Sequence, residues 1–282
     1  MDSPGTGDGG SRRVVPAGLD VTRPNQARVY DYLLGGKDNF EADRAAANKV
    51  LRVAPIMARA VRLNREFHQR AALWIAGQGV SQFVDVGCGL PTEENTHQVV
   101  CQVQPQARVL YMDNDPVVVS HGQALLPRGS DRVAVMAGDI RDPRAIIERV
   151  RSWPHADLDE PTGVLLTAVM HFIADDEDPW AMVALLMSAL APGSYLALSH
   201  GTADGLPSEM AAAGVAPLAT EYGRPHLRGK SAVTAMFAGL EIVPAAEGGL
   251  AEVCPPGAWR PPAGIEPDLL PGLWAGVGRK PS

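Results

Sequence analysis

Short apolar runs alternate with helix-like segments from residue 80 to the end of the chain. Three of these helices are expected to begin at Asp-Pro, because aspartate caps a first turn and proline fits its first position. Strands that alternate with helices form parallel sheets with right-handed crossovers. The sequence therefore predicts an α/β fold with a doubly wound, mostly parallel, seven-stranded sheet. Its strands are expected at residues 82–86, 107–112, 132–137, 163–170, 194–199, 240–243 and 273–278, and Asp-Pro stands at Asp115, Asp142 and Asp178.

The segment before residue 80 contains helix-like stretches and no strand-like run. The stretches are residues 24–34, 40–53 and 55–76, and Gly35-Gly36 ends the first of them. We expect three parts along the chain. They are a disordered tail at 1–21, an N-terminal helical cap or lid at 22–79, and a Rossmann-like domain at 80–282.

Composition narrows the classes of protein to which the chain can belong. It carries 25 Lys and Arg against 32 Asp and Glu, a net charge of -7, which does not favour nucleic-acid binding. Its three cysteines form no CxxC pair, which fits a reducing compartment. No apolar run reaches the roughly 18 residues of a membrane helix. We expect a cytoplasmic protein that binds neither nucleic acid nor membrane, with an oligomeric state that the sequence leaves open.

A glycine-rich turn, Gly87-Cys88-Gly89, follows the first expected strand. Two closely spaced glycines let the backbone turn sharply and approach a ligand before the next helix, for which Thr92 is the expected N-cap. A dinucleotide fingerprint needs a third glycine at that position, so a nicotinamide cofactor is disfavoured. Asp85 stands just inside the strand, and we expect it to organise the loop because a buried carboxylate needs hydrogen bonds.

Polar residues also follow the next two strands. Asp113 ends the second strand, with Asn114 beside it, and a carboxylate there suits the two hydroxyls of a ribose. Asp139 and Ile140 follow the third strand and pair an acceptor with an apolar side chain, which suits the amine edge and the face of an adenine. Because the carboxyl ends of parallel strands meet at one edge, these residues predict a nucleotide site.

The fourth strand leads into Ala168 and His171. The first and fourth strands flank the point where the winding of the sheet reverses, so this stretch is expected at the cleft. Ala168 is a candidate for cofactor contact. His171 is a candidate general base near neutral pH, or a histidine that only forms a hydrogen bond or packs at the strand end.

These strand ends, taken in order, resemble the class I S-adenosylmethionine-dependent methyltransferases. Five further stretches resemble an actinobacterial methyltransferase family long described only as a domain of unknown function, and the resemblance covers nearly the whole chain after residue 22. It implies an S-adenosyl-L-methionine cofactor, with Gly87 and Gly89 at the methionine part, Asp113 at the ribose, and Asp139 with Ile140 at the adenine. Cys88 departs from the Ser, Thr or Ala more usual there. The five stretches are residues 28–40, 64–67, 89–97, 111–116 and 278–280.

Charge within the helical segment suggests two further contacts. Arg65 precedes the first strand, and its planar fork suits the carboxylate of the cofactor. Residues 23–75 hold ten basic against five acidic side chains, although the whole chain is acidic. Such a basic cap predicts docking to an acidic sheet domain and an anionic methyl acceptor.

Methyl transfer from a sulfonium is an in-line displacement, in which the protein supplies alignment and electrostatics and a base is optional. If the acceptor must lose a proton, the candidate bases are His171, Tyr30, Tyr32 and His200. We expect a small-molecule acceptor and no metal. Two alternatives stay open, a non-catalytic S-adenosylmethionine-binding or regulatory protein and, less favoured, a nicotinamide-dependent oxidoreductase.

Overall fold

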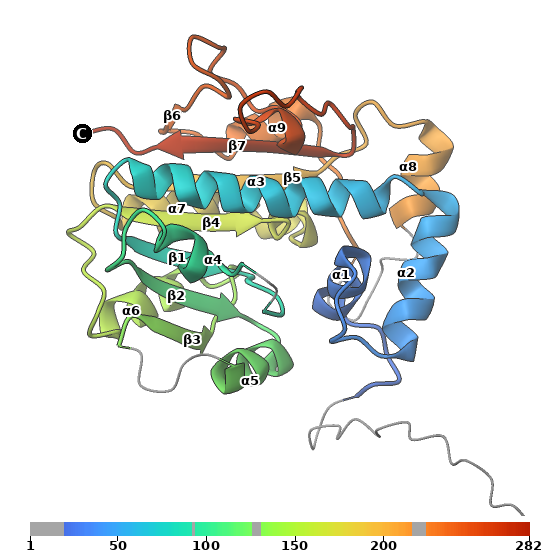
Figure 1. The fold of residues 1–282 in the computed structure, drawn as a ribbon, viewed down its shortest axis with the longest axis horizontal. Helices are drawn as coiled ribbons and strands as arrows, with labels where there is room; N and C mark the ends of the chain where they lie inside the picture. Colours follow the sequence, from blue (N-terminus) through green and yellow to red (C-terminus); the bar gives the residue numbers. More distant parts are fainter. Residues whose placement is uncertain (1–19, 92–93, 126–130, 216–223) are drawn as a thin grey trace, which may run out of the picture.

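A computed structural model describes residues 20–91, 94–125, 131–215 and 224–282 and has a seven-stranded sheet at its centre (Figure 1). The strand order is β3-β2-β1-β4-β5-β7-β6. Strands β1 to β5 run parallel, whereas β7 is antiparallel to both β5 and β6. The predicted fold class is confirmed. The strands are β1 Gln82–Val86, β2 Arg108–Asp113, β3 Val133–Ala137, β4 Thr162–Thr167, β5 Tyr195–Gly201, β6 Glu241–Ile242 and β7 Leu273–Arg279.

The winding of the sheet reverses between β1 and β4. From β1 the chain proceeds through β2 to β3 at one edge, and then returns to form β4 on the other side of β1. Open α/β sheets bind ligands outside the carboxyl ends of the strands at such a reversal. The expected site therefore lies beyond Val86 and Thr167.

Nine α-helices surround the sheet in the described part of the chain. The three predicted Asp-Pro starts are confirmed: Asp142 and Asp178 accept hydrogen bonds from the backbone three residues on, at 3.0 and 3.1 Å, and Asp115 Oδ1 accepts one from Val117 at 2.8 Å. Short-range capping thus fixes where these helices begin. The helices are α1 Gln26–Leu34, α2 Glu41–Val53, α3 Met57–Gly77, α4 Thr96–Val100, α5 Pro116–Leu125, α6 Pro143–Ser152, α7 Pro179–Ser188, α8 Ser208–Val215 and α9 Lys230–Ala235.

Two boundaries differ from the sequence prediction by three residues, more than the shifts of one or two residues at other element ends. Helix α4 begins at Thr96 with Asn95 as its N-cap, and Glu94 before it has a left-handed φ of 58°, so the helix starts later than predicted. The predicted cap Thr92 lies outside the described residues. Strand β4 ends at Thr167 and not at residue 170, because Ala168 adopts a φ of 57° and a 3₁₀ turn, Met170–Phe172, follows.

Helix α3 covers one face of the sheet. Phe67, Ala71 and Ile75 on this helix are fully buried in a cluster that includes Phe83 and Leu165 of the strands. The opposite face is covered by apolar residues of α6 and α7. Helices on both faces are the arrangement that a parallel sheet requires.

Helices α1 and α2 lie beside the carboxyl ends of the strands, near α8 (Figure 1). A small cluster that includes Val29, Leu33 and Ala47 joins them, and Arg28 Nε donates to Asp43 Oδ2 at 2.8 Å in the same interface. These two helices therefore close the region beyond the strand ends. Residues 1–19 of the predicted tail lie outside the described residues. None of the described helices has the length and apolar character needed to span a membrane.

Candidate active site

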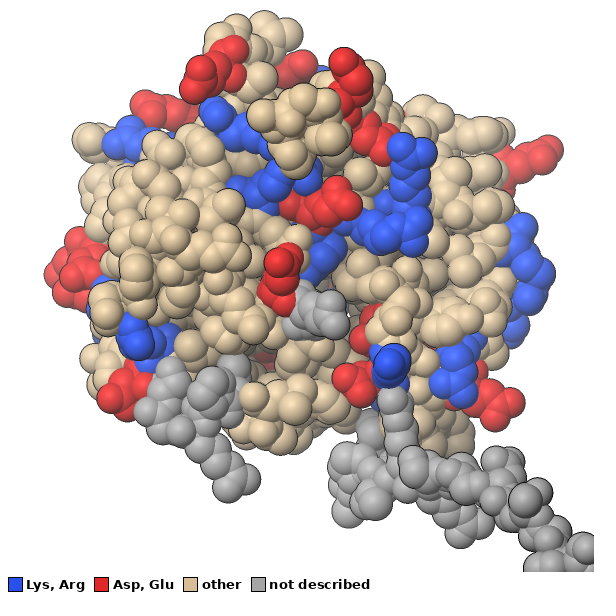
Figure 2. All heavy atoms as spheres, in the orientation of Figure 1, with Lys and Arg blue, Asp and Glu red and all other residues tan. Residues whose placement is uncertain are grey.

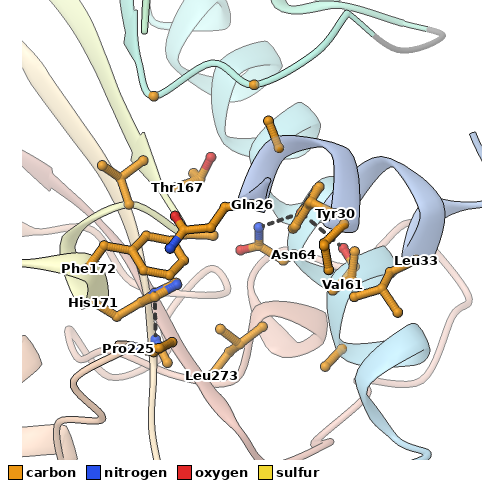
Figure 3. Close-up of a pocket in the computed structure, with 18 of the residues that line it drawn as sticks. Gln26, Tyr30, Leu33, Val61, Asn64, Thr167, His171, Phe172, Pro225 and Leu273 are labelled. Atoms are coloured by element: carbon orange, nitrogen blue, oxygen red, sulfur yellow. Dashed lines mark hydrogen bonds between the residues drawn. The ribbon is translucent and has the colours of Figure 1, made fainter. Parts of the chain in front are cut away.

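A cavity of about 290 Å³ lies at the carboxyl ends of the strands and beneath α1. One end of it is formed by residues that follow β1, β2 and β3, and the other by α1, the start of α3, the turn after β4 and the segment after β5. Figure 3 shows part of this wall, where Gln26 and Tyr30 of α1, Asn64 of α3 and His171 of the turn after β4 project into the same space. Twelve of the thirteen candidate cofactor and catalytic residues line it, all but Tyr32: Tyr30, Arg65, Asp85, Gly87, Cys88, Gly89, Asp113, Asn114, Asp139, Ile140, Ala168 and His171.

The glycine loop after β1 needs both of its glycines. Gly87 has a φ of 71° and donates its N–H to Met112 O at 2.7 Å, and a Cβ on it would overlap the side chain of Val169. Gly89 has a φ of 65°, and no atom lies within 4 Å of the place where its Cβ would stand. The loop therefore presents bare backbone to the open cavity, which allows a ligand to approach closely.

Asp113 fixes the glycine loop to the end of β2. Its Oδ2 accepts the N–H of Gly89 at 3.0 Å, and its Oδ1 accepts the N–H of Asp115 at 2.9 Å. Burial raises the pKa of the Asp113 carboxyl, although these backbone hydrogen bonds oppose the shift. Each carboxylate oxygen can accept a further hydrogen bond, so the group can serve the loop and a ligand together.

The end of β3 adds a second group of polar residues to the cavity wall. Asn114 Nδ2 donates to Asp139 Oδ2 at 3.1 Å, and the N–H of Arg141 donates to Asp139 Oδ1 at 2.9 Å. Ile140, next to Asp139 in the chain, is buried and lines the cavity. The two residues that the sequence pairs as an acceptor and an apolar surface thus lie together.

Asp85 was expected to organise the glycine loop through backbone or ligand hydrogen bonds, and in the described part of the chain its side chain contacts the start of α4. Its Oδ2 accepts a hydrogen bond from Thr96 Oγ1 at 2.7 Å, and burial raises the pKa of Asp85 to about 6. Thr96 Oγ1 in turn lies 2.8 Å from His68 Nε2, and His68 Nδ1 lies 2.9 Å from Thr167 Oγ1. Burial lowers the pKa of His68 well below its ordinary range, which favours the neutral ring. Because the Thr96 hydroxyl donates its one proton to Asp85, Nε2 of His68 is the donor to Thr96 Oγ1.

Sequence reasoning did not single out His68 as a site residue. Its helix does carry a signal, because Asn64 and His68 are polar residues four apart on the same apolar face as Ala60, Phe67 and Ala71. Polar residues on a buried helix face must find partners. They find them at the ends of β1, β4 and β5.

Arg65 reaches the cavity from the neighbouring position on α3. Its Nη2 donates to Glu94 O at 2.9 Å, whereas its Nε is buried and has no hydrogen-bond partner within the described residues. A buried guanidinium donor without a partner is costly. An acceptor group of a bound ligand would satisfy it.

Of the two tyrosines of α1 that were candidate bases, one lines the cavity and the other does not. Tyr30 lines the cavity; its hydroxyl donates to Val61 O at 3.3 Å and accepts from Asn64 Nδ2 at 2.9 Å, and burial raises its pKa. Tyr32 lies away from the cavity, with its hydroxyl 3.4 Å from Asn48 Oδ1 on α2. Tyr32 thus does not line the cavity, because side chains two positions apart on a helix point to different sides, and its catalytic role stays a prediction.

A buried chain of hydrogen bonds continues from Tyr30. Asn64 Oδ1 accepts from Ser199 Oγ on β5, and Ser199 Oγ accepts the N–H of Ala168 at 2.9 Å. Ala168 holds a left-handed φ at the end of β4, a conformation that the surrounding structure must stabilise. The position of α1 is thus coupled to the backbone at the reversal point.

Of the two histidines considered as bases, one reaches the cavity. His200 is fully buried between Gly201 O and Arg228, and burial lowers its pKa to about 4. His171 lines the cavity, where its Nδ1 accepts the N–H of Gly201 at 3.3 Å. Burial, with His200 and Arg228 nearby, holds the pKa of His171 well below its usual range.

Comparison with known proteins identifies related chains over almost the full length. A model of the S-adenosyl methyltransferase family matches residues 12–281. A Thermobifida fusca protein, described as a candidate methyltransferase, is 37% identical with a TM-score of 0.85, over 95% of this chain and 98% of its own. A DUF574 family protein from Streptomyces avermitilis is 33% identical with a TM-score of 0.84, over 93% of this chain and 99% of its own. No curated protein matches the chain.

Proposed function

The chain belongs to the S-adenosyl methyltransferase family, and we propose that it transfers the methyl group of S-adenosyl-L-methionine, its cofactor, to a small molecule held in the same cavity. The observation that carries the proposal is the continuity of this cavity. It extends from the glycine loop and the acidic strand ends to a separate wall of α1 and α3. Two molecules can therefore meet in one continuous space.

The residues at the glycine-loop end fit the cofactor. The backbone of Gly87, Cys88 and Gly89 would border the methionine part, and the unpaired Nε of Arg65 would bind its carboxylate. Asp113 has acceptor capacity left for the ribose hydroxyls.

Other residues are candidates to bind the adenine of the cofactor and the part of the cofactor that faces the acceptor. Asp139 and Asn114 would hold the polar edge of the adenine, and Ile140 its face. Ala168, at the turn after β4, would contact the cofactor next to the acceptor space. We keep these positions as assignments that mutation can test one at a time.

The bound cofactor supplies a methyl group on a positively charged sulfur, which is already activated for displacement. The protein then has to align the acceptor, exclude water and keep other nucleophiles away. Helix α1, which packs against α2, would exclude water from the cavity, since it forms the wall opposite the strand ends. Tyr30, Asn64 and Ser199 would fix α1 relative to Ala168.

Isothermal titration of the full chain with S-adenosylmethionine, S-adenosylhomocysteine and NAD tests the proposal. We expect both sulfur compounds to bind and NAD not to bind. Absence of binding by both sulfur compounds would overturn the proposal, and binding of NAD alone would favour an oxidoreductase. Mass spectrometric detection of methylated products after incubation with a metabolite extract then distinguishes an enzyme from a binding protein.

A further inference from the structure

The acceptor end of the cavity is lined almost wholly by uncharged side chains. Figure 3 shows Leu33, Val61, Phe172, Pro225 and Leu273 around this space. Further apolar side chains complete the lining, namely Ile56, Met57, Ala60, Leu206, Met210 and Leu227. A surface of this kind favours apolar molecules.

The charged side chains that line the cavity either have hydrogen-bond partners within the protein or stand at the glycine-loop end. Asp31 accepts from the N–H of Asp38 at 2.9 Å and from Asn39 Nδ2 at 2.8 Å, at the end of α1. Arg141 Nε donates to Glu177 at 2.7 Å. The remaining ones belong to the glycine-loop end, as described above. Within the described residues, the acceptor end thus offers no cation to pair with an anionic acceptor, and its carboxylate, Asp31, already accepts two N–H groups of the protein.

The basic residues of the N-terminal segment do not change this conclusion. Of the ten in residues 23–75, Arg65 lines the cavity, and it stands at the glycine-loop end. Figure 2 shows Lys and Arg on the outer surface over α2, and the exposed basic residues of this segment include Arg44, Lys49, Arg52 and Arg62. The basic charge on which the predicted anionic acceptor depends therefore faces away from the cavity.

His171 supplies a polar atom at this end. Its Nδ1 accepts a backbone N–H from Gly201, so Nδ1 carries no proton, and a neutral imidazole must then carry its proton on Nε2. The ring packs at 4.3 Å from the ring of Phe172, and His200 and Arg228 are the titratable or charged groups beside it. Nε2 has no partner in the described part of the chain. It is a donor that faces the cavity.

We propose that the acceptor is an uncharged, largely apolar molecule whose oxygen or nitrogen accepts a hydrogen bond from His171 Nε2–H. His171 in this state cannot remove a proton through Nε2, so it orients the acceptor and does not act as a general base. An anionic acceptor would lose its hydration without gaining a cationic partner, and a cationic acceptor would have to share Asp31 with the two N–H groups that this carboxylate already accepts. This inference rests on the proposed function, since it concerns the second molecule in the same cavity.

Three naphthalene derivatives that differ in charge test the class of acceptor. Naphthol, naphthoate and naphthylmethylamine are neutral, anionic and cationic probes on one ring system. Titrated into the full chain saturated with S-adenosylhomocysteine, naphthol should bind at least about tenfold more tightly than either ion. Equal or tighter binding of an ion, or no binding of naphthol, would overturn the proposal.

Two variants test the role of His171. His171→Gln keeps an N–H donor and should keep naphthol affinity within about threefold, whereas His171→Phe keeps a ring but no donor and should lose about tenfold. Equal losses in both variants would contradict the donor role. In ¹⁵N spectra of histidine-labelled protein at neutral pH, His171 should show a bare Nδ1 and a protonated Nε2, and the opposite tautomer would overturn the assignment.

Binding of S-adenosylhomocysteine separates the two proposals. Both His171 variants should bind it as the wild type does, because His171 stands at the acceptor end. If the wild type does not bind it, the proposed function fails. If it binds while the naphthol results fail, the proposed function stands and the acceptor class alone is wrong.

Discussion

Replacing Asp113 with alanine should remove two functions of one carboxylate, and each loss can be measured alone. In the folded chain this carboxylate accepts the N–H groups of Gly89 and Asp115. Alanine leaves both donors without their partner. A buried donor without a partner costs about 1–3 kcal/mol. We expect the free energy of unfolding without ligand to fall by about 2–4 kcal/mol, measured by urea denaturation.

The second loss concerns the cofactor. If Asp113 binds the ribose hydroxyls, its removal should weaken S-adenosylhomocysteine binding by at least about tenfold, or ~1.4 kcal/mol. Isothermal titration of the folded variant measures this value. Asp113→Asn keeps one acceptor oxygen and should lose less in both assays.

Asp142→Ala serves as the matched control. Asp142 also accepts a backbone N–H, but it caps α6 outside the cavity. Its loss should cost about 1 kcal/mol of stability and leave cofactor affinity unchanged. Wild-type affinity in a folded Asp113→Ala protein would refute the ribose assignment, and wild-type stability would refute the role in holding the loop.

Two further predictions concern the buried parts of the fold. Asp85 has a folded pKa raised to about 6 from its ordinary value of 3.8, so between these values the folded chain binds more protons than the unfolded chain, and stability falls as pH rises. In Asp85→Asn the free energy of unfolding should fall less over this pH window, by up to about 3 kcal/mol, as measured by urea unfolding at several pH values. Wild-type and variant stabilities that change in parallel with pH would contradict this prediction. Phe67→Ala should lower the free energy of unfolding by about 3–5 kcal/mol, because the ring is fully buried and packs edge-on against Trp259 at 5.6 Å; a loss under about 1 kcal/mol would contradict the packing argument.

Local signals predicted much of this fold. The Asp-Pro pairs mark three helix starts because capping involves atoms only two or three residues apart. The glycine loop and Asp113 are likewise readable, since the carboxyl ends of neighbouring parallel strands always meet at one edge. The sequence therefore placed the cofactor candidates of β1, β2 and β3 at one cavity.

Features that depend on packing between distant segments were not predictable in the same way. Whether Tyr30 or Tyr32 enters the cavity depends on how α1 rotates against α2 and α3, and both are plausible from the sequence. The state of His171 depends on Gly201, which is 30 residues away along the chain. The partner of Asp85 was missed because Thr96 meets it only once α4 starts at its observed position.

Helix α3 links the interior of the sheet domain to the wall of the cavity. Phe67, Ala71 and Ile75 hold it on the sheet, while Asn64, Arg65 and His68 form part of the site. A change of sequence on this helix therefore risks folding and cofactor binding together. Helix α1 and the segment between β5 and α9 contain fewer residues that are needed both for packing on the sheet and for cofactor binding. Members of the family that methylate different acceptors should thus diverge there, while α3 stays nearly constant among them.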